Sequence, residues 1–300
     1  MAKFLAQRDT KWGVNPRLYN QQYESYRHQN PIVHIGDNLE KILLDALPNL
    51  PEKSILVVTC KIIALSEGSV AERKLATKKE KWAVVQQQAE LYTDPGQSQY
   101  NLMLTVKDQI MAVNAGIDES NADGAYVLFP KNAYASAEKI WRLLRDHYQI
   151  KQLGVLIIDS KTFPLKWGTI GTALAYCGFQ PVNDRRGEKD LFGYEMVMTK
   201  ENIAEGLAAA ANVEMGEVAE QKPLCLIENL EKVVFQDHPP TPAEIEELNI
   251  SIVDDVYAPV LTKANWQKGG HHQSKNLSDK SHSTTSQQAS AKEMIHHSSK

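Results

Sequence analysis

Cysteine is scarce in this chain and never forms a motif. The 300 residues contain three cysteines, Cys60, Cys177 and Cys225, far apart and without a Cys-x-x-Cys spacing. An odd number of widely spaced cysteines encodes neither a disulfide framework nor a structural zinc site. A reducing compartment is the simplest setting, so the sequence predicts a cytoplasmic protein.

Long hydrophobic runs and a strong charge of one sign are also lacking. The first residues contain no continuous apolar segment, and no stretch approaches the roughly 18 apolar residues of a membrane span. Lys and Arg number 33 against 37 Asp and Glu, a formal net charge of -4. Such a balance gives no long-range attraction to phosphate backbones. We therefore expect no membrane anchor and no general nucleic-acid binding.

The common catalytic signatures are missing as well. The sequence contains no Gly-x-x-x-x-Gly-Lys-Ser/Thr loop, no Gly-x-Gly-x-x-Gly turn between a strand and a helix, no Gly-x-Ser-x-Gly elbow and no His-Glu-x-x-His helix. Each of these motifs supplies a specific phosphate cradle, nucleophile or metal ligand pair. A P-loop or Rossmann site therefore has no support in the sequence.

Helical and strand periodicities alternate along the body of the chain. Hydrophobic residues make up 42% of the chain, typical of a globular protein. Residue patterns predict helices over 38–46, 73–91, 135–148 and 200–215, and strands over 54–59, 109–114, 125–129, 153–158, 194–198 and 224–227. The capping box Thr241-Pro242-Ala243-Glu244 predicts a further helix from Pro242. Residues 171–177 fit a helix or a strand equally well. The pattern predicts a mixed α and β body.

Both ends of the chain differ from this body. We divide the sequence into an N-terminal extension (1–30), a core (31–235), a C-terminal extension packed on the core (236–266) and a tail (267–300). The tail is rich in Ser, Gln, Lys and His, and it cannot bury enough apolar surface to offset its ordering entropy, which predicts disorder. Scattered histidine pairs in such a tail are more often solvated than metal-binding.

Two acidic residues directly follow apolar strands. Asp118 lies in Asn114-Ala115-Gly116-Ile117-Asp118, and Asp159 ends the run Leu156-Ile157-Ile158-Asp159. Carboxylates brought together at strand ends would form a site for Mg²⁺ or Mn²⁺, which usually bring phosphates with them. The alternative is that both residues only cap turns, which is the commoner use of Asp in such places.

Two basic clusters leave similar alternatives open. Lys61 follows a predicted strand, where an ammonium can meet a phosphate, although a single lysine is more often solvated. Arg185 and Arg186 lie in a charged loop and can clamp a carboxylate, or belong to a salt-bridged surface loop.

Several segments, in one order and spacing over roughly residues 31–230, resemble the coenzyme F420:L-glutamate ligases, a family of γ-glutamyl ligases. The matching pieces are Gly36-Asp37 with Leu39, residues 57–62 through Glu67-Gly68, residues 114–118 with Ser120-Asn121, Ser136-Ala137, Ile158-Asp159, Asp184 with Arg186-Gly187, Asp190 with Phe192-Gly193, Thr199 and the helix end 208–216. The run Asn-Ala-Gly-Ile-Asp-x-Ser-Asn is the most specific of them.

The resemblance implies an α+β fold with mixed sheets and flanking helices, assembled as an intertwined homodimer. It also implies an ATP- or GTP-dependent ligase that uses Mg²⁺ or Mn²⁺. The residues at the family's metal positions are Asp118, Asp159, Ser160 and Glu217, and those at its nucleotide positions are Cys60, Lys61, Asn121 and Gly216. Asp118, Asp159 and Arg186 are then the expected catalytic residues.

The sequence departs from the family around these positions. After Asp159 the family reads Thr-Phe-Gly-Arg-Pro-Trp-Arg, whereas this chain reads Ser-Lys-Thr-Phe-Pro-Leu-Lys-Trp-Gly, and Leu65 replaces a family lysine. Because the metal positions are kept while their surroundings change, the sequence favours the bacterial branch thought to add glutamate to folates. Coenzyme F420 as the acceptor, and a non-catalytic nucleotide-binding descendant, are the alternatives.

Overall fold

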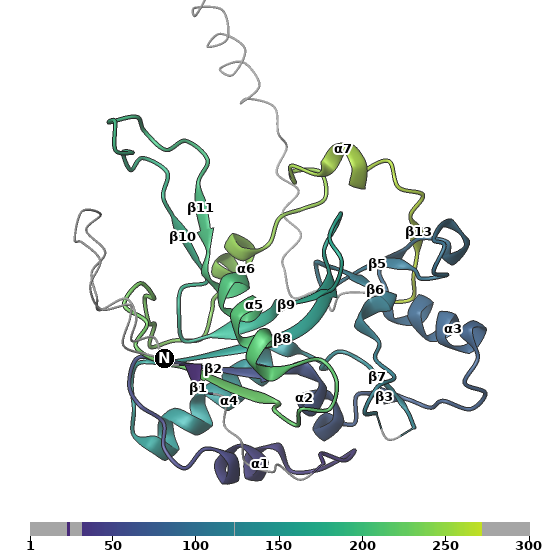
Figure 1. Ribbon diagram of the computed structural model, residues 1–300, viewed down its shortest axis with the longest axis horizontal. Coiled ribbons are helices and arrows are strands. Elements are labelled where there is room, and N and C mark those ends of the chain that lie inside the picture. The colour runs from purple at the N-terminus through teal and green to yellow at the C-terminus, as the bar shows by residue number, and fades with distance from the viewer. Residues whose placement is uncertain (1–22, 25–31, 123, 272–300) are drawn as a thin grey trace, which may run out of the picture.

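The computed structural model describes Tyr23–Glu24, residues 32–122 and residues 124–271 (Figure 1). The predictions for most of the N-terminal extension, and for the tail beyond His271, lie outside the described residues. Among the described residues, no helix combines the length and the apolar character that crossing a membrane would require. Cys60, Cys177 and Cys225 are buried and form no disulfide with one another.

A five-stranded sheet forms the centre of the molecule, in the order β1-β12-β2-β8-β9. Strands β2 and β8 are parallel, and the other neighbours are antiparallel. The strands are β1 (Tyr23–Glu24), β2 (Ser54–Thr59), β8 (Leu153–Thr162), β9 (Thr169–Cys177) and β12 (Leu224–Ile227). Residues 171–177, which the sequence leaves open between helix and strand, belong to strand β9. This strand pairs with residues 155–162 of β8.

Helices cover both faces of this sheet, which explains the continuous apolar runs of β2 and β8. One face packs against α1 (Leu39–Ala46) and α4 (Ala133–Tyr148), with Leu56, Val155 and Trp141 in one core cluster. The opposite face packs against the alanine-rich α5 (Ile203–Met215). Alanines allow a close approach: a Cβ on Gly171 of β9 would lie 2.3 Å from the carbonyl oxygen of Ala208.

Helix α2 (Cys60–Glu67) follows β2 without a break and was not predicted. The sequence predicts a strand over 54–59 with Lys61 just after it. The structure instead places Lys61 in the first turn of α2, and Gly68 ends the helix with a φ of 63°.

A second sheet lies beside the first and has the order β13-β4-β5-β6, antiparallel throughout. Its strands are β4 (Leu91–Tyr92), β5 (Leu104–Lys107), β6 (Ile110–Val113) and β13 (Gln267–Lys268), and α3 (Lys78–Gln88) precedes it. A small sheet joins β3 (Val70–Ala71) to β7 (Tyr126–Val127). Short 3₁₀ turns are η2 (Pro95–Gln97) and η3 (Asn114–Gly116).

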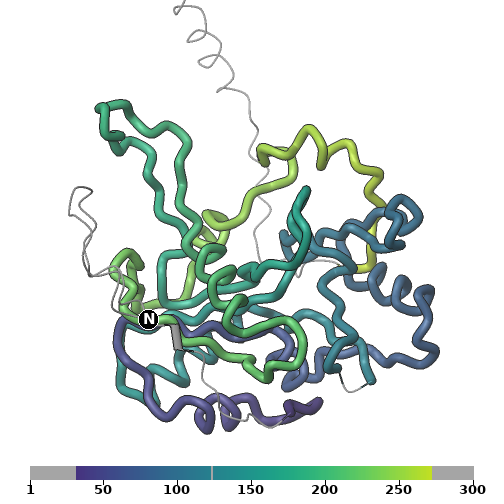
Figure 2. The backbone as a smooth tube through the Cα atoms, in the orientation of Figure 1, coloured from purple at the N-terminus to yellow at the C-terminus, as the bar shows by residue number. Residues whose placement is uncertain are grey.

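The C-terminal segment crosses from the central sheet to the second sheet, as the yellow end of the tube in Figure 2 shows. It carries α6 (Pro242–Leu248), which begins at the predicted capping box, then α7 (Ala258–Leu261) and finally β13. Strand β13 corrects the predicted boundary of the disordered tail, because Gln267 and Lys268 pair with Tyr92 and Leu91.

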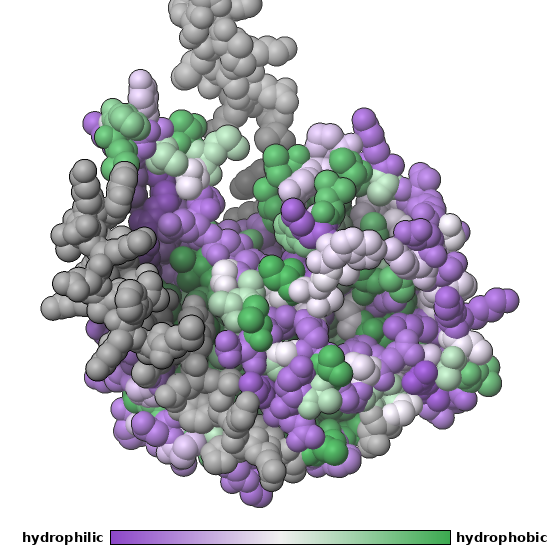
Figure 3. Space-filling view, viewed as in Figure 1, coloured by the Kyte–Doolittle hydropathy of each residue, from purple (hydrophilic) through white to green (hydrophobic). Residues whose placement is uncertain are grey.

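A long arm projects from the body between β10 (Val182–Asp184) and β11 (Lys200–Asn202), at the upper left of Figure 1. The strand predicted over residues 194–198 is wrong, since these residues lie in the loop of the arm, and the helix predicted from residue 200 begins at Ile203. Figure 3 shows hydrophobic side chains at the end of the arm. Leu191 and Phe192 are 99% and 86% exposed there.

Candidate active site

A cavity of about 730 Å³ opens where β2 and β8 end, and segments far apart in the chain surround it. Its walls are Thr59 and Lys61 at the β2–α2 junction, residues 158–160 of β8, residues 116–121, and the segment 212–223 at the end of α5. Seven predicted site residues line it: Lys61, Asp118, Asn121, Asp159, Ser160, Gly216 and Glu217. The structure therefore gathers residues separated by more than 150 positions.

Asp118 is presented by a strained turn after β6. Asn114, Ala115 and Gly116 have consecutive φ values of 53°, 55° and 68°, a left-handed run that costs free energy at the two residues other than glycine. Local hydrogen bonds hold the turn: the Asn114 side chain accepts from the Met103 amide at 3.0 Å, and Thr105 Oγ1 accepts from the Ala115 amide at 2.8 Å. Such a held turn is typical of functional sites.

The carboxylate of Asp118 is fully engaged. Oδ2 lies 2.5 Å from Lys61 Nζ, and Oδ1 accepts from the Ser120 amide at 2.7 Å and the Ser120 hydroxyl at 2.9 Å. Burial raises the pKa of Asp118, but the hydrogen bond and charge of Lys61, together with the bonds from Ser120, outweigh burial and bring the pKa below its usual value. Asp118 is therefore a stable anion beside a cation.

Asp159 has the opposite character. It lies on β8 where the strand leaves the buried core, and Cys60 Sγ donates to its Oδ1 at 3.5 Å. Burial is the main cause that raises the pKa of Asp159 to about 6, and the charge of Asp118 adds to it, while hydrogen bonds from Ser160 and Cys60 and the charge of Lys61 oppose it. A positive charge added beside Asp159, besides that of Lys61, would therefore stabilise its ionised form.

Ser160 and Glu217 form a pair on the far wall of the cavity. The Ser160 hydroxyl donates to Glu217 Oε2 at 3.0 Å, and Asn212 Nδ2 donates to Oε1 at 2.6 Å. Gly216 turns the chain from α5 toward Glu217 with a φ of 82° and a ψ of 177°, a backbone conformation that is essentially restricted to glycine. A glycine is therefore required at the helix end that brings Glu217 to the cavity.

Asn121 and Lys61 connect the loops of the site. Asn121 Nδ2 donates to the carbonyl oxygen of Val218 at 2.7 Å, which ties the Asp118 loop to the segment after α5. Lys61 Nζ also donates to the carbonyl oxygen of Ser120 at 3.1 Å. Neighbouring Glu119 is anchored to α3 by Lys81 at 2.6 Å. The loop is thus fixed from both sides.

Two predicted site residues lie elsewhere. Cys60 is buried behind the cavity wall, so its side chain supports Asp159 instead of lining the nucleotide position that the resemblance implies. Arg186 lies on the arm, where its Nε donates to Asp184 at 2.9 Å, and it does not line the cavity. The separation arises because the charged loop forms a hairpin that points away from the body (Figure 1).

Asn212 and His34 line the cavity, and the sequence analysis did not identify them. Asn212 is a polar residue in the last turn of an otherwise alanine-rich helix, one turn before Gly216, and that position is the signal that could have identified it. His34 lies before α1 in a segment without periodicity, and no sequence signal singles it out.

Comparison with known proteins places the region that contains the cavity in one family. The family model described as F420-0:Gamma-glutamyl ligase matches residues 28–229. A coenzyme F420:L-glutamate ligase of Methanosarcina mazei is 32% identical over 217 residues, covering 67% of this chain and 83% of that protein. The enzyme of the same name from Methanocaldococcus jannaschii is 34% identical over 212 residues, covering 66% of this chain and 84% of that protein.

These relatives correct the preferred acceptor. The departures around Asp159 favour a folate-type acceptor, but both of these relatives are coenzyme F420:L-glutamate ligases, so the folate interpretation is not supported. Most of the departures after Asp159 lie on the β8–β9 hairpin, where Leu165 and Trp167 are exposed. Ser160 and Leu65, by contrast, line the cavity. With a family model that spans more than half of its length, this chain belongs to the F420-0:gamma-glutamyl ligase family.

Proposed function

We propose that this protein joins L-glutamate through a γ-glutamyl amide bond to an F420-type acceptor at the expense of ATP or GTP. The observation that carries the proposal is the single cavity that gathers Asp118, Asp159, Glu217 and Lys61 within the matched family region. Three carboxylates and an ammonium are the groups that a phosphoryl-transfer site needs for its metal ions and phosphates. The type of reaction, γ-glutamyl ligation, is inferred from the family match.

The side chains at the cavity fit Mg²⁺ or Mn²⁺. Asp118, Asp159, Ser160 and Glu217 offer only oxygen atoms, which these hard cations prefer. Asp159 also has a raised pKa, about 6, beside the charge of Asp118, a pair of anions that a divalent cation would stabilise. When bound, such ions would offset the charge that accumulates on phosphate oxygens.

The chain's own cationic and amide groups would orient the co-substrates. An amide forms from a carboxylate when a phosphoryl group is first transferred to the carboxylate oxygen, giving an acyl phosphate and a nucleoside diphosphate. The amine of glutamate then attacks the acyl carbon, and phosphate leaves. Lys61, in the first turn of α2, would hold the transferred phosphoryl group. Asn121 holds the Asp118 loop closed against Val218, which fixes the position of Asp118.

The position of Arg186 is consistent with a homodimer, which we include in the proposal. In one subunit the arm points away from its own cavity, and its end exposes Leu191, Phe192 and Tyr194, the last at 74%. An apolar end of this kind on a projecting hairpin is typical of a surface that another protein covers. In a dimer, Arg186 would be available to a substrate carboxylate at the second subunit.

The activity is tested with purified protein, L-glutamate, Mg²⁺ or Mn²⁺, ATP or GTP, and either coenzyme F420-0 or a reduced folate, followed by mass spectrometry of the acceptor. We expect a mass increase of one or more glutamyl units on the F420-type acceptor. An increase on the folate alone would overturn the acceptor assignment. Nucleotide binding without any product would favour the non-catalytic alternative.

The dimer is tested separately by light scattering. Phe192→Ser, together with Leu191→Ser, is expected to shift the protein from dimer to monomer. Leu75→Ser, at a residue 73% exposed elsewhere on the surface, is the matched control and should leave the mass unchanged. A wild-type protein that is a monomer at micromolar concentration would overturn the dimer.

A further inference from the structure

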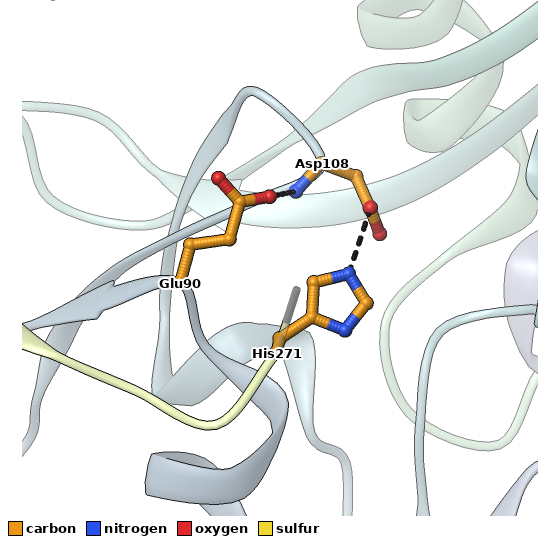
Figure 4. A group of neighbouring side chains, drawn as sticks. All are labelled: Glu90, Asp108 and His271. Carbon is orange, nitrogen blue, oxygen red and sulfur yellow. Dashed lines mark hydrogen bonds and ion pairs between the residues drawn. The ribbon is translucent and has the colours of Figure 1, made fainter. Parts of the chain in front are cut away.

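A second group of metal-ligating side chains lies at the second sheet, apart from the cavity. Glu90 follows α3, Asp108 lies in the turn between β5 and β6, and His271 follows β13 (Figure 4). His271 Nε2 lies 3.0 Å from Asp108 Oδ1, and the Asp108 amide donates to Glu90 Oε1 at 2.8 Å. One possible ligand atom from each residue lies within 4.8 Å of the others.

The backbone fixes the position of His271. The amides of Gly269, Gly270 and His271 donate to the carbonyl oxygens of Glu90, Gln86 and Ala89 at 2.8, 2.8 and 3.1 Å. A Cβ on Gly269 would lie 1.9 Å from the carbonyl oxygen of Ala89, so the segment can approach α3 this closely only with glycine at that position. His271 is therefore held beside the two carboxylates by contacts that do not involve its side chain.

Within the part of the chain that the structure describes, neither carboxylate forms a close ion pair with a lysine or an arginine. Among ion pairs of the described residues, Asp108 pairs with His271, and neither lysine nor arginine pairs with Glu90. Lys107 interacts with both carboxylates at longer range, but its ammonium donates to Gln88 Oε1 at 2.8 Å and lies over the Phe129 ring. With a neutral imidazole, Glu90 and Asp108 together carry two negative charges, which a divalent ion would balance.

We propose that Glu90, Asp108 and His271 bind a divalent transition-metal ion, with Zn²⁺ the best fit. One imidazole and two carboxylates are ligands that Zn²⁺ accepts, and three protein ligands leave a fourth position for water. The imidazole makes the group a poor site for Mg²⁺ or Ca²⁺, which prefer oxygen ligands. Ligand atoms around a tetrahedral zinc ion lie about 3.4 Å apart, so small side-chain rotations would complete the site.

The ion would clamp the C-terminal segment to the second sheet. Strand β13 has only two residues, and its pairing with β4 is the edge contact of that sheet. A metal that joins His271 to the β5–β6 turn adds a cross-link whose binding free energy also stabilises the docked segment. Strand β6 leads directly into the strained turn before Asp118, so the clamp stabilises the sheet from which that turn begins.

The test uses the full chain with the histidines that follow the cluster, His272, His282, His296 and His297, replaced by glutamine. Zn²⁺ affinity is measured by competition with a chromophoric chelator in excess Mg²⁺, which occupies the hard-cation site of the cavity. We expect one Zn²⁺ per chain, with affinity at least tenfold lower for His271→Gln and for Asp108→Asn. His238→Gln is the matched control, because His238 lies 3.9 Å from the single carboxylate of Glu244, and it should leave the affinity unchanged.

Hydrogen exchange gives a readout that is independent of affinity. Zn²⁺ is expected to slow exchange at the amides of residues 267–271 in the parent chain and not in His271→Gln. Unchanged Zn²⁺ affinity in both His271→Gln and Asp108→Asn would overturn the proposal. Protection of these amides that depends on pH but not on Zn²⁺ would also overturn the proposal. In that case the ion pair between His271 and Asp108 alone would hold the segment, without a metal.

Discussion

Asp118 and Asp159 line one cavity from two very different regions of the molecule. Asp159 lies on β8, a ten-residue strand of the central sheet between β2 and β9, and pairs with Thr172 of β9 just beyond the last residue paired with β2. Asp118 lies on a loop whose backbone passes through three left-handed residues and is anchored by side-chain hydrogen bonds. Backbone pairing in the sheet fixes the position of Asp159. The position of Asp118 depends instead on particular residues that adopt the left-handed backbone and on the side chains that hold it.

The electrostatic difference follows from this placement. The sheet buries Asp159 and raises its pKa to about 6, whereas the exposed side of the loop lets Lys61 and Ser120 reach Asp118 and lower its pKa. The charge of Asp118 is thus compensated by Lys61, whereas the ionised form of Asp159 would be stabilised by an added cation. If both carboxylates bind the proposed ion, they contribute unequally: Asp118, already neutralised by Lys61, fixes the geometry, and the buried Asp159 gains most from the ion.

The largest expected effect is the loss of turnover when either carboxylate is removed. Asp118→Asn and Asp159→Asn should each lower the rate of glutamate addition by more than about 100-fold, because both are expected to hold the metal that offsets phosphate charge. Product formation is measured by mass spectrometry, with folding checked by circular dichroism. Asp45→Asn, on the exposed face of α1, is the matched control.

A near-normal rate in one of the two variants would contradict a shared role for the two carboxylates. It would show that this carboxylate does not share the metal, and the remaining one would then act with Glu217 and Ser160 alone. Equal losses in both variants would support a shared ion.

The strained turn gives the next largest effect, on stability. A Cβ on Gly116 would lie 1.9 Å from the Phe129 ring at a φ of 68°, so Gly116→Ala should lower the free energy of unfolding by about 3 kcal/mol. Gly124→Ala is the matched control: its φ is 79°, but nothing lies within 4 Å of the added carbon, and about 1 kcal/mol is expected. Both are measured by chemical denaturation, and equal losses would show that the ring contact is unimportant.

The opposite pKa shifts predict opposite effects of the same substitution on metal-free protein. The pKa of Asp159 is raised in the folded state, so its ionisation costs stability as the pH rises from about 4 through about 6. Asp159→Asn should therefore stabilise the protein at pH 8, by about 1–3 kcal/mol, and have little effect below pH 4.

Asp118 has a lowered pKa, so its contribution is present above about pH 4 and is lost as the pH falls further. Asp118→Asn should destabilise the protein at pH 8, by about 0.5–1 kcal/mol after solvent screening. Thermal unfolding in chelator at pH 4 and pH 8 measures both variants. The same sign for the two variants at pH 8 would contradict the asymmetry.

The sequence predicts the sheet region better than the loop region, for physical reasons. Apolar runs such as 54–59 and 153–158 are recognised because both faces of these strands are buried. The position of Asp159 after the second run makes it a candidate ligand, with turn capping as the alternative. Caps are equally local, and α6 begins at Pro242 as the capping box predicts. Helix α2 was missed because its apolar residues continue the run of β2, and nothing in a short apolar run separates a buried helix from a strand.

Long-range contacts could not be predicted from local patterns. The arm was divided into a loop, a strand and a helix because its register depends on pairing between β10 and β11, which sequence alone does not specify. Strand β13 was assigned to a disordered tail because its composition is polar, and its order comes from pairing with β4 and from the close approach of Gly269. The family resemblance placed Arg186 at the site, but it did not reveal that the arm points away.

The smallest effect concerns Cys60, which links the two regions because it begins α2 and donates to Asp159. That hydrogen bond lowers the pKa of Asp159, so Cys60→Ala should raise the pKa by less than about one unit. If ionised Asp159 holds the metal, the acidic limb of the pH–rate profile moves to higher pH, and Cys60→Ser restores it because a hydroxyl also donates. Cys177→Ala, at a buried residue of β9, controls for lost packing. A limb that moves equally in both alanine variants would show that Cys60 acts by packing, and that the contrast between the two carboxylates depends on burial alone.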